Sequence, residues 1–190
     1  MTVFISCDIE TNGPIPNPNS MLQLGAAAFD RKGELISTYQ VNLEELPGGE
    51  RCEKTMKWWA EQGDLFEKTR QNMVPPEKAM LEFCNWVEET CRGRGKPVFA
   101  GYPVAWDFSF VFWYLIRFVG RSPFSHSALD IKTLAAVALD KELDYRQVSK
   151  SSMPRDWFSE SAHTHVAVDD AVEQGELMFK IFEAIRERRS

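Results

Sequence analysis

The sequence predicts an α/β domain with a mixed β-sheet flanked by helices, and three observations predict it. Strand-like patterns follow one another with short links up to residue 41. From residue 54 the hydrophobic period becomes helical, and short apolar strands alternate with the helices. The 190 residues are 44% hydrophobic, enough for one full-sized core. We therefore expect residues 1–190 to form a single layered domain.

Three strands are predicted first, over residues 2–9, 21–29 and 35–41. The proline- and asparagine-rich segment 14–20 is expected to be irregular, and residues 30–33 form a turn. Because the links are short, the strands form an antiparallel meander. The small side chains at Gly25, Ala26 and Ala27 indicate that another element packs closely against the second strand.

Helices and two short strands follow. We expect a short helix that begins near residue 54, a second near 64–71, and a longer one from 75 to about 91 with prolines in its first turn. A strand at 98–101, a helix at 107–119, a strand end at 128–130 and a helix through 139 come next. Residues 140–162 are expected to be irregular, before an amphipathic helix from about 166 to 187. The inward residues of the 107–119 helix are expected to be Phe108, Val111, Phe112, Leu115 and Phe118.

The composition excludes some classes of protein. The net charge of −6 and the pI of about 5.2 argue against a protein that coats a nucleic-acid duplex, which usually needs a basic face. They do not exclude an enzyme that holds only the end of a strand. No apolar run approaches the length of a membrane span, and no secretory segment precedes the first strand. The four cysteines lack zinc spacing, so we expect reduced thiols in a cytoplasmic protein.

Two acidic side chains end the first strand. Asp8 and Glu10 leave the same face of the strand, while Ile9 turns into the core. Carboxylates held this close repel each other, and burial would raise at least one pKa unless a cation neutralised them. Mg²⁺ or Mn²⁺, with their preference for oxygen ligands, would suit. The spacing alone favours a plainer explanation, a strand that ends in solvent.

Three more candidate residues follow along the chain. Asp107 begins a helix after a short strand, where sites gather in α/β sheets, although an aspartate there also stabilises the helix dipole. His165 opens the last helix and Asp170 follows five residues later, beside small alanines that permit close approach. A capping histidine and a solvated aspartate are the alternative.

Taken together, these five residues resemble the site of the DEDDh-type 3′-5′ exonucleases, which have four acidic metal ligands, one histidine and an RNase H-like fold. The first motif, Asp-x-Glu-Thr-x-Gly, is matched from Asp8 to Gly13, and the second by residues 21–26. The last motif, His-x-Ala-x-x-Asp-Ala, is matched in full and selects Asp170 rather than Asp169. Asp130 resembles a recurring element with a supporting role. The resemblance spans residues 3–175.

A subgroup of small bacterial and phage exonucleases that act on RNA is suggested by Trp58, Trp59 and Gln62. An exposed tryptophan could stack on an unpaired base, worth ~1–3 kcal/mol, although one of the two is expected in the core. Gln62 could bind a base edge or cap its helix. Thr11, Asn12 and Gly13 would lie beside the terminal sugar, where a pocket for the 2′-hydroxyl would favour RNA.

The resemblance implies a metal-dependent 3′-5′ exoribonuclease that acts on single-stranded RNA or 3′ overhangs and releases nucleoside 5′-monophosphates. Asp8, Glu10 and Asp170 would hold one Mg²⁺ or Mn²⁺, Asp8 would share a second, and Asp107 would steady the site. Two ions about 3.5–4 Å apart would bind the attacking and leaving oxygens. His165, with an ordinary pKa near 6.5, would accept the proton of the attacking water.

Several alternatives stay open. The same chemistry could act on single-stranded DNA, and a non-catalytic nucleic-acid-binding module is a further class, although all five site positions are filled. Pro14 stands where relatives carry an apolar wedge between bases, so base separation is unexplained. Some of the basic residues of segment 140–162 could contact phosphates, but acidic neighbours favour a solvated loop for most of them: Lys141, Arg146, Lys150 and Arg155. A homodimer is expected without a motif to support it.

Overall fold

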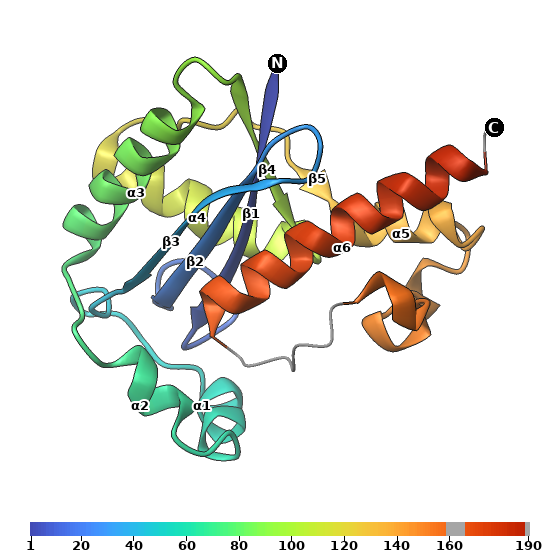
Figure 1. The fold of residues 1–190 in the computed structure, drawn as a ribbon. Coiled ribbons are helices and arrows are strands. Elements are labelled where there is room, and N and C mark those ends of the chain that lie inside the picture. The colour runs from blue at the N-terminus through green and yellow to red at the C-terminus, as the bar shows by residue number, and fades with distance from the viewer. Residues whose placement is uncertain (159–165, 189–190) are drawn as a thin grey trace.

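The computed structural model describes residues 1–158 and 166–188, and it contains a five-stranded mixed sheet in the order β3-β2-β1-β4-β5 (Figure 1). Strands β1 (Thr2–Thr11), β2 (Met21–Phe29) and β3 (Leu35–Asn42) form an antiparallel meander. Strands β4 (Lys96–Gly101) and β5 (Leu129–Asp130) continue the sheet in parallel with β1. The predicted mixed sheet is confirmed.

Six α-helices in the described residues surround the sheet (Figure 1). Helix α6 (Ala167–Glu187) crosses one face with α5 (Ile131–Ala138) beside it, and α3 (Pro76–Cys91) and α4 (Val104–Val119) cover the other. Helices α1 (Glu53–Ala60) and α2 (Leu65–Thr69) lie beyond the end of β1. Within the described ranges, none of the helices combines the length and apolar character that crossing a bilayer requires.

Central strand β1 determines which side chains face which layer. Val3, Ile5, Cys7 and Ile9 are buried in the core shared with α3 and α4. Since side chains alternate along a strand, Asp8 and Glu10 share the opposite face, which α6 covers. Strand β1 pairs with β4 only as far as Ser6, and the part that carries the two carboxylates is held by its pairing with β2.

Helix α6 packs so closely against β2 that two of the contact positions have no room for a side chain. A Cβ atom on Gly25 would lie 2.0 Å from the carbonyl carbon of Ala167, and one on Gly175 would lie 2.0 Å from the Phe29 ring. The close packing predicted from the small residues of the second strand is confirmed. It brings the first turn of α6 against the strands that carry the site.

Two sequence expectations need correction. Helix α4 begins three residues before the expected start, and it also buries Phe110 and Tyr114. Of the expected inward residues, Val111 and Leu115 are buried and Phe108 and Phe118 pack against the core, whereas Phe112 is half-buried outside that cluster. The α4 sequence is apolar on almost every side, so its period could not select the buried face. Segment 140–158 contains three short 3₁₀ helices, η1 (Tyr145–Gln147), η2 (Lys150–Ser152) and η3 (Arg155–Trp157), where irregular structure was expected. All four cysteines are free thiols, as predicted.

Candidate active site

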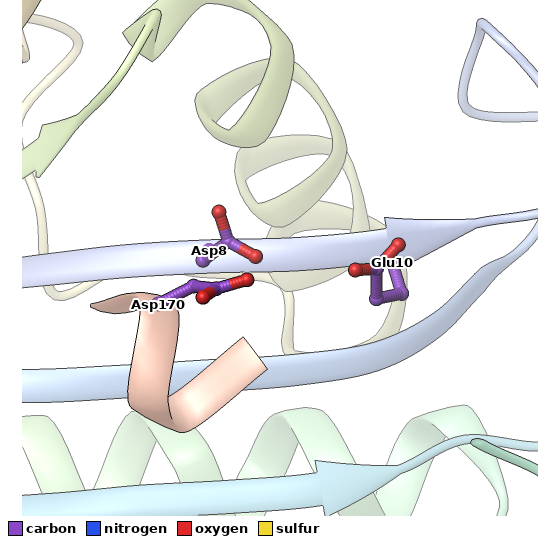
Figure 2. A group of neighbouring side chains, drawn as sticks. All are labelled: Asp8, Glu10 and Asp170. Carbon is purple, nitrogen blue, oxygen red and sulfur yellow. The ribbon is translucent and has the colours of Figure 1, made fainter. Parts of the chain in front are cut away.

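Three carboxylates meet where β1 runs under the start of α6 (Figure 2). Asp8 and Glu10 project from the same face of β1, and Asp170 comes down from the first turn of α6. One oxygen of each lies within 4.8 Å of the others. The predicted convergence of residues from opposite ends of the chain is therefore present in the structure.

Burial and mutual repulsion perturb these acids strongly. Burial, together with the charge of the neighbouring Asp170, raises the pKa of Asp8 to about 7, although Gln174 and Lys150 oppose the change. Burial also raises the pKa of Glu10 to about 9, with added repulsion from Asp8 and Asp170. Without a counter-charge, ionisation of all three carboxyl groups at neutral pH costs free energy, because the charges are buried and repel one another. Their oxygen-only donor set fits a hard divalent cation such as Mg²⁺ or Mn²⁺.

Asp107 borders the same site from the other side. It lies buried in the first turn of α4 and lines a cavity of about 270 Å³ together with Asp8, Glu10 and Asp170. Burial and the charge of Asp8 raise its pKa, while the backbone N–H of Ile9, which donates a hydrogen bond to it, acts in the opposite direction. All four predicted acidic residues therefore face one cavity.

Asp130 fixes the position of Asp107 through the start of α4. Its Oδ1 accepts a hydrogen bond from the backbone N–H of Val104 at 3.1 Å. Its Oδ2 accepts from the Thr133 backbone N–H at 3.2 Å and from the Tyr145 hydroxyl at 2.9 Å. The supporting role expected for Asp130 is confirmed by these contacts.

Two glutamines to which the sequence analysis gave no role hold the acidic cluster together. Gln174 is buried and donates from Nε2 to Asp8 Oδ1 at 2.6 Å. Gln23, in β2, accepts a hydrogen bond from the first N–H of α6, on Ala167, at 2.9 Å. Gln174 stands four positions after Asp170, so helical spacing placed it on the same face. Gln23 is a lone polar residue in an otherwise apolar strand, a second signal that was available.

Among the residues that the structure describes, Lys150 is the one basic residue of the cavity lining. It belongs to η2, and its Nζ lies 2.7 Å from Oε1 of Glu173 on α6. The cavity borders on Lys150 but not on Lys141, Arg146 or Arg155, the other basic residues considered from sequence. The predicted solvated, mixed-charge loop thus contains one cation that reaches the acidic site.

A second, larger cavity adjoins the first. It measures about 610 Å³ and shares Ile9, Glu10 and Trp106 with the acidic cavity. Trp58 and Trp106 line it with 40% and 41% of their surfaces exposed. Aromatic walls next to an acidic cavity suit a nucleotide whose phosphate and base bind side by side.

The structure separates the two adjacent tryptophans. Trp59 is 1% exposed, and its Nε1 donates to the carbonyl of Thr11 at 2.9 Å, so it belongs to the core rather than to a substrate surface. Trp58 is the member of the pair that faces the second cavity. Helical geometry explains the difference, because neighbouring positions point about 100° apart.

The remaining predicted contact residues differ in position. Thr11 lines the second cavity, with its hydroxyl donating to the Gly13 carbonyl at 3.0 Å. The expectation for Asn12 is corrected, because its fully buried side chain donates to Glu45 at 2.9 Å and accepts from the Ser20 N–H. A Cβ atom on Gly13 would lie 2.3 Å from Cγ of Asn19, so glycine makes room for the asparagine side chain at this position. Exposed Gln62 turns back to the Trp58 carbonyl, in agreement with the capping alternative.

His165 lies outside the described residues, in segment 159–165. Its predicted role as the proton acceptor stays a prediction.

A family model described as the 3′-5′ exoribonuclease Rv2179c-like domain matches residues 3–182. The 3′-5′ DNA exonuclease Cap18 of Escherichia coli is 29% identical over 189 residues, which cover 98% of this chain and 95% of Cap18.

Solved structures show the same fold at low sequence identity. The nuclease domain of 3′hExo, a DEDDh family member bound to rAMP, has a TM-score of 0.68 at 10% identity and covers 96% of this chain and 91% of its own. Pop2p of S. pombe, in a form with bound Mg²⁺ and Mn²⁺, has a TM-score of 0.62 at 15% identity and covers 95% and 84%. The E. coli ExoI–ssDNA complex has a TM-score of 0.66 at 15% identity, and this chain spans only 42% of it.

These likenesses confirm the RNase H-like fold, and the family model covers most of the sequence. The chain therefore belongs to the family of Rv2179c-like 3′-5′ exoribonuclease domains and is a 3′-5′ exonuclease.

Proposed function

We propose that this protein removes nucleotides one at a time from the 3′ end of single-stranded RNA or of a 3′ overhang, and releases nucleoside 5′-monophosphates. The observation that carries the proposal is that carboxylates from β1, α4 and α6 border a single cavity. Three of them crowd within 4.8 Å, an arrangement that is costly without a divalent cation.

Asp8, Glu10 and Asp170 would hold one divalent ion, and Asp107 would help to hold a second across the cavity. Bound Mg²⁺ or Mn²⁺ would lower the pKa of water and stabilise charge on the reacting phosphate. His165 would accept the proton of the attacking water. Trp58 would stack on a base in the adjoining cavity, and Thr11 would lie beside the terminal sugar.

The preferred sugar is the finer part of the proposal. RNA is supported by the matched family, whose description is that of an exoribonuclease. Single-stranded DNA is the second candidate, supported by the relationship to Cap18, which is described as a DNA exonuclease. We favour RNA because the family model describes the domain over residues 3–182, whereas Cap18 is a single relative at 29% identity.

The test is digestion of RNA and DNA strands of identical sequence, labelled at the 5′ end, single-stranded or with blunt or 3′-overhanging ends. With Mg²⁺ or Mn²⁺, labelled RNA should shorten stepwise from its 3′ end, faster than DNA. The matched control is Asp8→Asn, which removes a charge from the cluster with little change in shape. Faster loss of DNA would assign the second candidate, and no release of nucleoside 5′-monophosphate from any strand would refute both.

We also propose that residues 1–190 act as one exonuclease domain, as a homodimer in the cytoplasm. Sedimentation equilibrium of the full chain, with a mass of 21.8 kDa per protomer, measures the oligomeric state.

A further inference from the structure

The acidic cavity contains a cation whose presence the carboxylates alone do not explain. Lys150 lines the cavity beside Asp8, Asp107 and Asp170. Its ammonium is 2.7 Å from Glu173, and the two side chains are 30% and 14% exposed. Because the pair is partly buried, the lysine is held at one place rather than moving freely in solvent.

Glu173 fixes this lysine relative to the acidic cluster. Glu173 stands three positions after Asp170 on α6, so the same helix carries both a site carboxylate and the partner of the lysine. An ammonium has three N–H donors, and the hydrogen bond to Glu173 requires only one of them. The remaining donor capacity lies at the border of the cavity in which a phosphodiester would react.

The charge balance of the cavity gives the lysine a purpose. Divalent ions would neutralise the four carboxylates, and each phosphodiester that enters brings one further negative charge. In phosphoryl transfer the transition state spreads charge over the non-bridging oxygens, where a fixed cation is worth most. A single lysine supplies the matching positive charge as a point donor.

We propose that Lys150 donates a hydrogen bond to a non-bridging oxygen of the scissile phosphodiester, and that Glu173 holds it there. This inference rests on the proposed function and names one contact of the same site with its nucleic-acid substrate. Lys150 would thus be a substrate-contacting catalytic residue, and Glu173 a positioning residue.

The first test measures single-turnover release of the 3′-terminal nucleotide, with Mg²⁺, by three variants. Lys150→Met should slow release by about 10–100-fold, since a charge-assisted hydrogen bond to the reacting phosphate is lost. Lys150→Arg should retain most of the rate. The matched control, Lys141→Met, removes the same charge from the same segment outside the cavity and should react at the wild-type rate.

A double variant separates substrate contact from a merely structural pair. If Lys150 served only to neutralise Glu173, Lys150→Met with Glu173→Gln would restore the wild-type rate. If it contacts the phosphate, the double variant should stay as slow as Lys150→Met. Restoration would overturn the proposal.

A binding measurement tests the contact without turnover. With Ca²⁺ in place of Mg²⁺, Kd is measured for a single-stranded RNA of 12 nucleotides at several salt concentrations. The slope of log Kd against log salt concentration should become shallower by about 0.7 in Lys150→Met and should not change in Lys141→Met. A rate within twofold of wild type, or an unchanged slope, overturns the role of Lys150. A wild-type protein that releases no nucleotide overturns the proposed function instead, and the slope then decides the lysine contact alone.

Discussion

At the scale of single residues, the site is defined by carboxyl groups whose pKa values lie well above those of the same groups in water. Asp8 and Glu10 have pKa values of about 7 and about 9, against ordinary values of 3.8 and 4.5. Burial is the largest cause for both, followed by repulsion from the neighbouring carboxylates. A divalent cation would remove that repulsion, so ion binding and folding are linked.

The first prediction is a pH-dependent stability that divalent ions reverse. Raised pKa values mean that the folded state binds protons more tightly than the unfolded chain. Without divalent ions, the contribution of these two carboxyl groups to the free energy of unfolding should therefore be fully present below about pH 4. It should be lost as the pH rises through 7 towards 9. We expect a loss on the order of 1–2 kcal/mol, discounted for partial exposure. Urea titrations at several pH values measure it.

The same titrations with Mg²⁺ or Mn²⁺ should show a stabilisation that grows with pH. Glu10→Gln should flatten the fall without ions, whereas Glu176→Gln, a change at an exposed position of α6, should not. A stability that rises from pH 5 to pH 9 without ions would contradict the assignment.

The second prediction concerns His165. Replacement by alanine should slow hydrolysis by roughly 10²–10⁴-fold, because the attacking water loses its proton acceptor. The stabilisation by divalent ions, measured by thermal shift, should persist, since the carboxylates remain. His126→Ala, at an exposed position, is the control and should react normally. A wild-type rate for His165→Ala would exclude the proton-acceptor role.

Which site residues could be predicted depended on whether a motif carried them. The acidic residues and their order followed from the resemblance, and the structure places them around one cavity. Gln23 lies within the second motif but was given no role, and Gln174 and Lys150 belong to no motif, because their importance arises from contacts with residues distant in sequence. Asn12 was misjudged because a polar residue beside a motif can be fully occupied by its own loop.

At the scale of elements, the docking of α6 on the sheet decides whether the site exists. Gly25 lies opposite Asp8 in the β1–β2 register, and it also touches the first residues of α6. The position of Asp170 relative to β1 therefore depends on the absence of a side chain at Gly25. A single methyl group there would act on the site from the neighbouring strand.

The third prediction is that Gly25→Ala displaces the start of α6. Its Cβ would lie 2.0–2.3 Å from backbone atoms of Ala167 and Val168, which cannot move as a flexible side chain would. We expect a destabilisation of about 1–3 kcal/mol or more and loss of the stabilisation by Mg²⁺. Circular dichroism melts with and without the ion measure both.

Gly48→Ala is the control for this experiment. Its Cβ would enter open space, although the positive φ of 71° makes the substitution mildly strained. It should lower stability modestly and keep the full effect of Mg²⁺. Equal effects of the two substitutions would show that contact with α6 is unimportant.

Element by element, the sequence was most informative where its period was clear. The apolar run of β2 and the alternating pattern of β3 predicted their bounds to within one residue. The buried face of helix α4 was harder to predict, since the helix has apolar residues on almost every side. Its burial of Phe110 and Tyr114 depends on tertiary packing alone. The hydroxyl of Tyr114, which accepts the N–H of Met21 at 2.8 Å, makes one such tertiary contact.

At the scale of the whole molecule, an acidic cavity adjoins a second cavity that has aromatic side chains in its walls. Glu10 and Trp106 line both, so a nucleotide that binds the ions would extend directly towards Trp58. The fold itself was predictable, because strands and helices followed in a recognisable order. The shape of this groove was not, since it combines residues from β1, α1 and α4.

The fourth prediction compares the two adjacent tryptophans. Trp58→Ala should weaken substrate binding by about 1–3 kcal/mol, with little effect on folding, because one base loses its stacking partner. Trp59→Ala should instead destabilise the fold by about 3–5 kcal/mol through an internal cavity. Fluorescence anisotropy with a labelled oligonucleotide and chemical denaturation measure the two effects. Equal affinity of Trp58→Ala and wild type would remove Trp58 from the substrate surface.

Asp8 and its hydrogen-bonded partner Gln174 are 166 positions apart in the chain. During translation the strand that carries Asp8 emerges first, and the helix that carries Asp170 and Gln174 emerges more than a hundred residues later. A nascent polypeptide on the ribosome therefore cannot assemble this acidic cluster until α6 has left the exit tunnel.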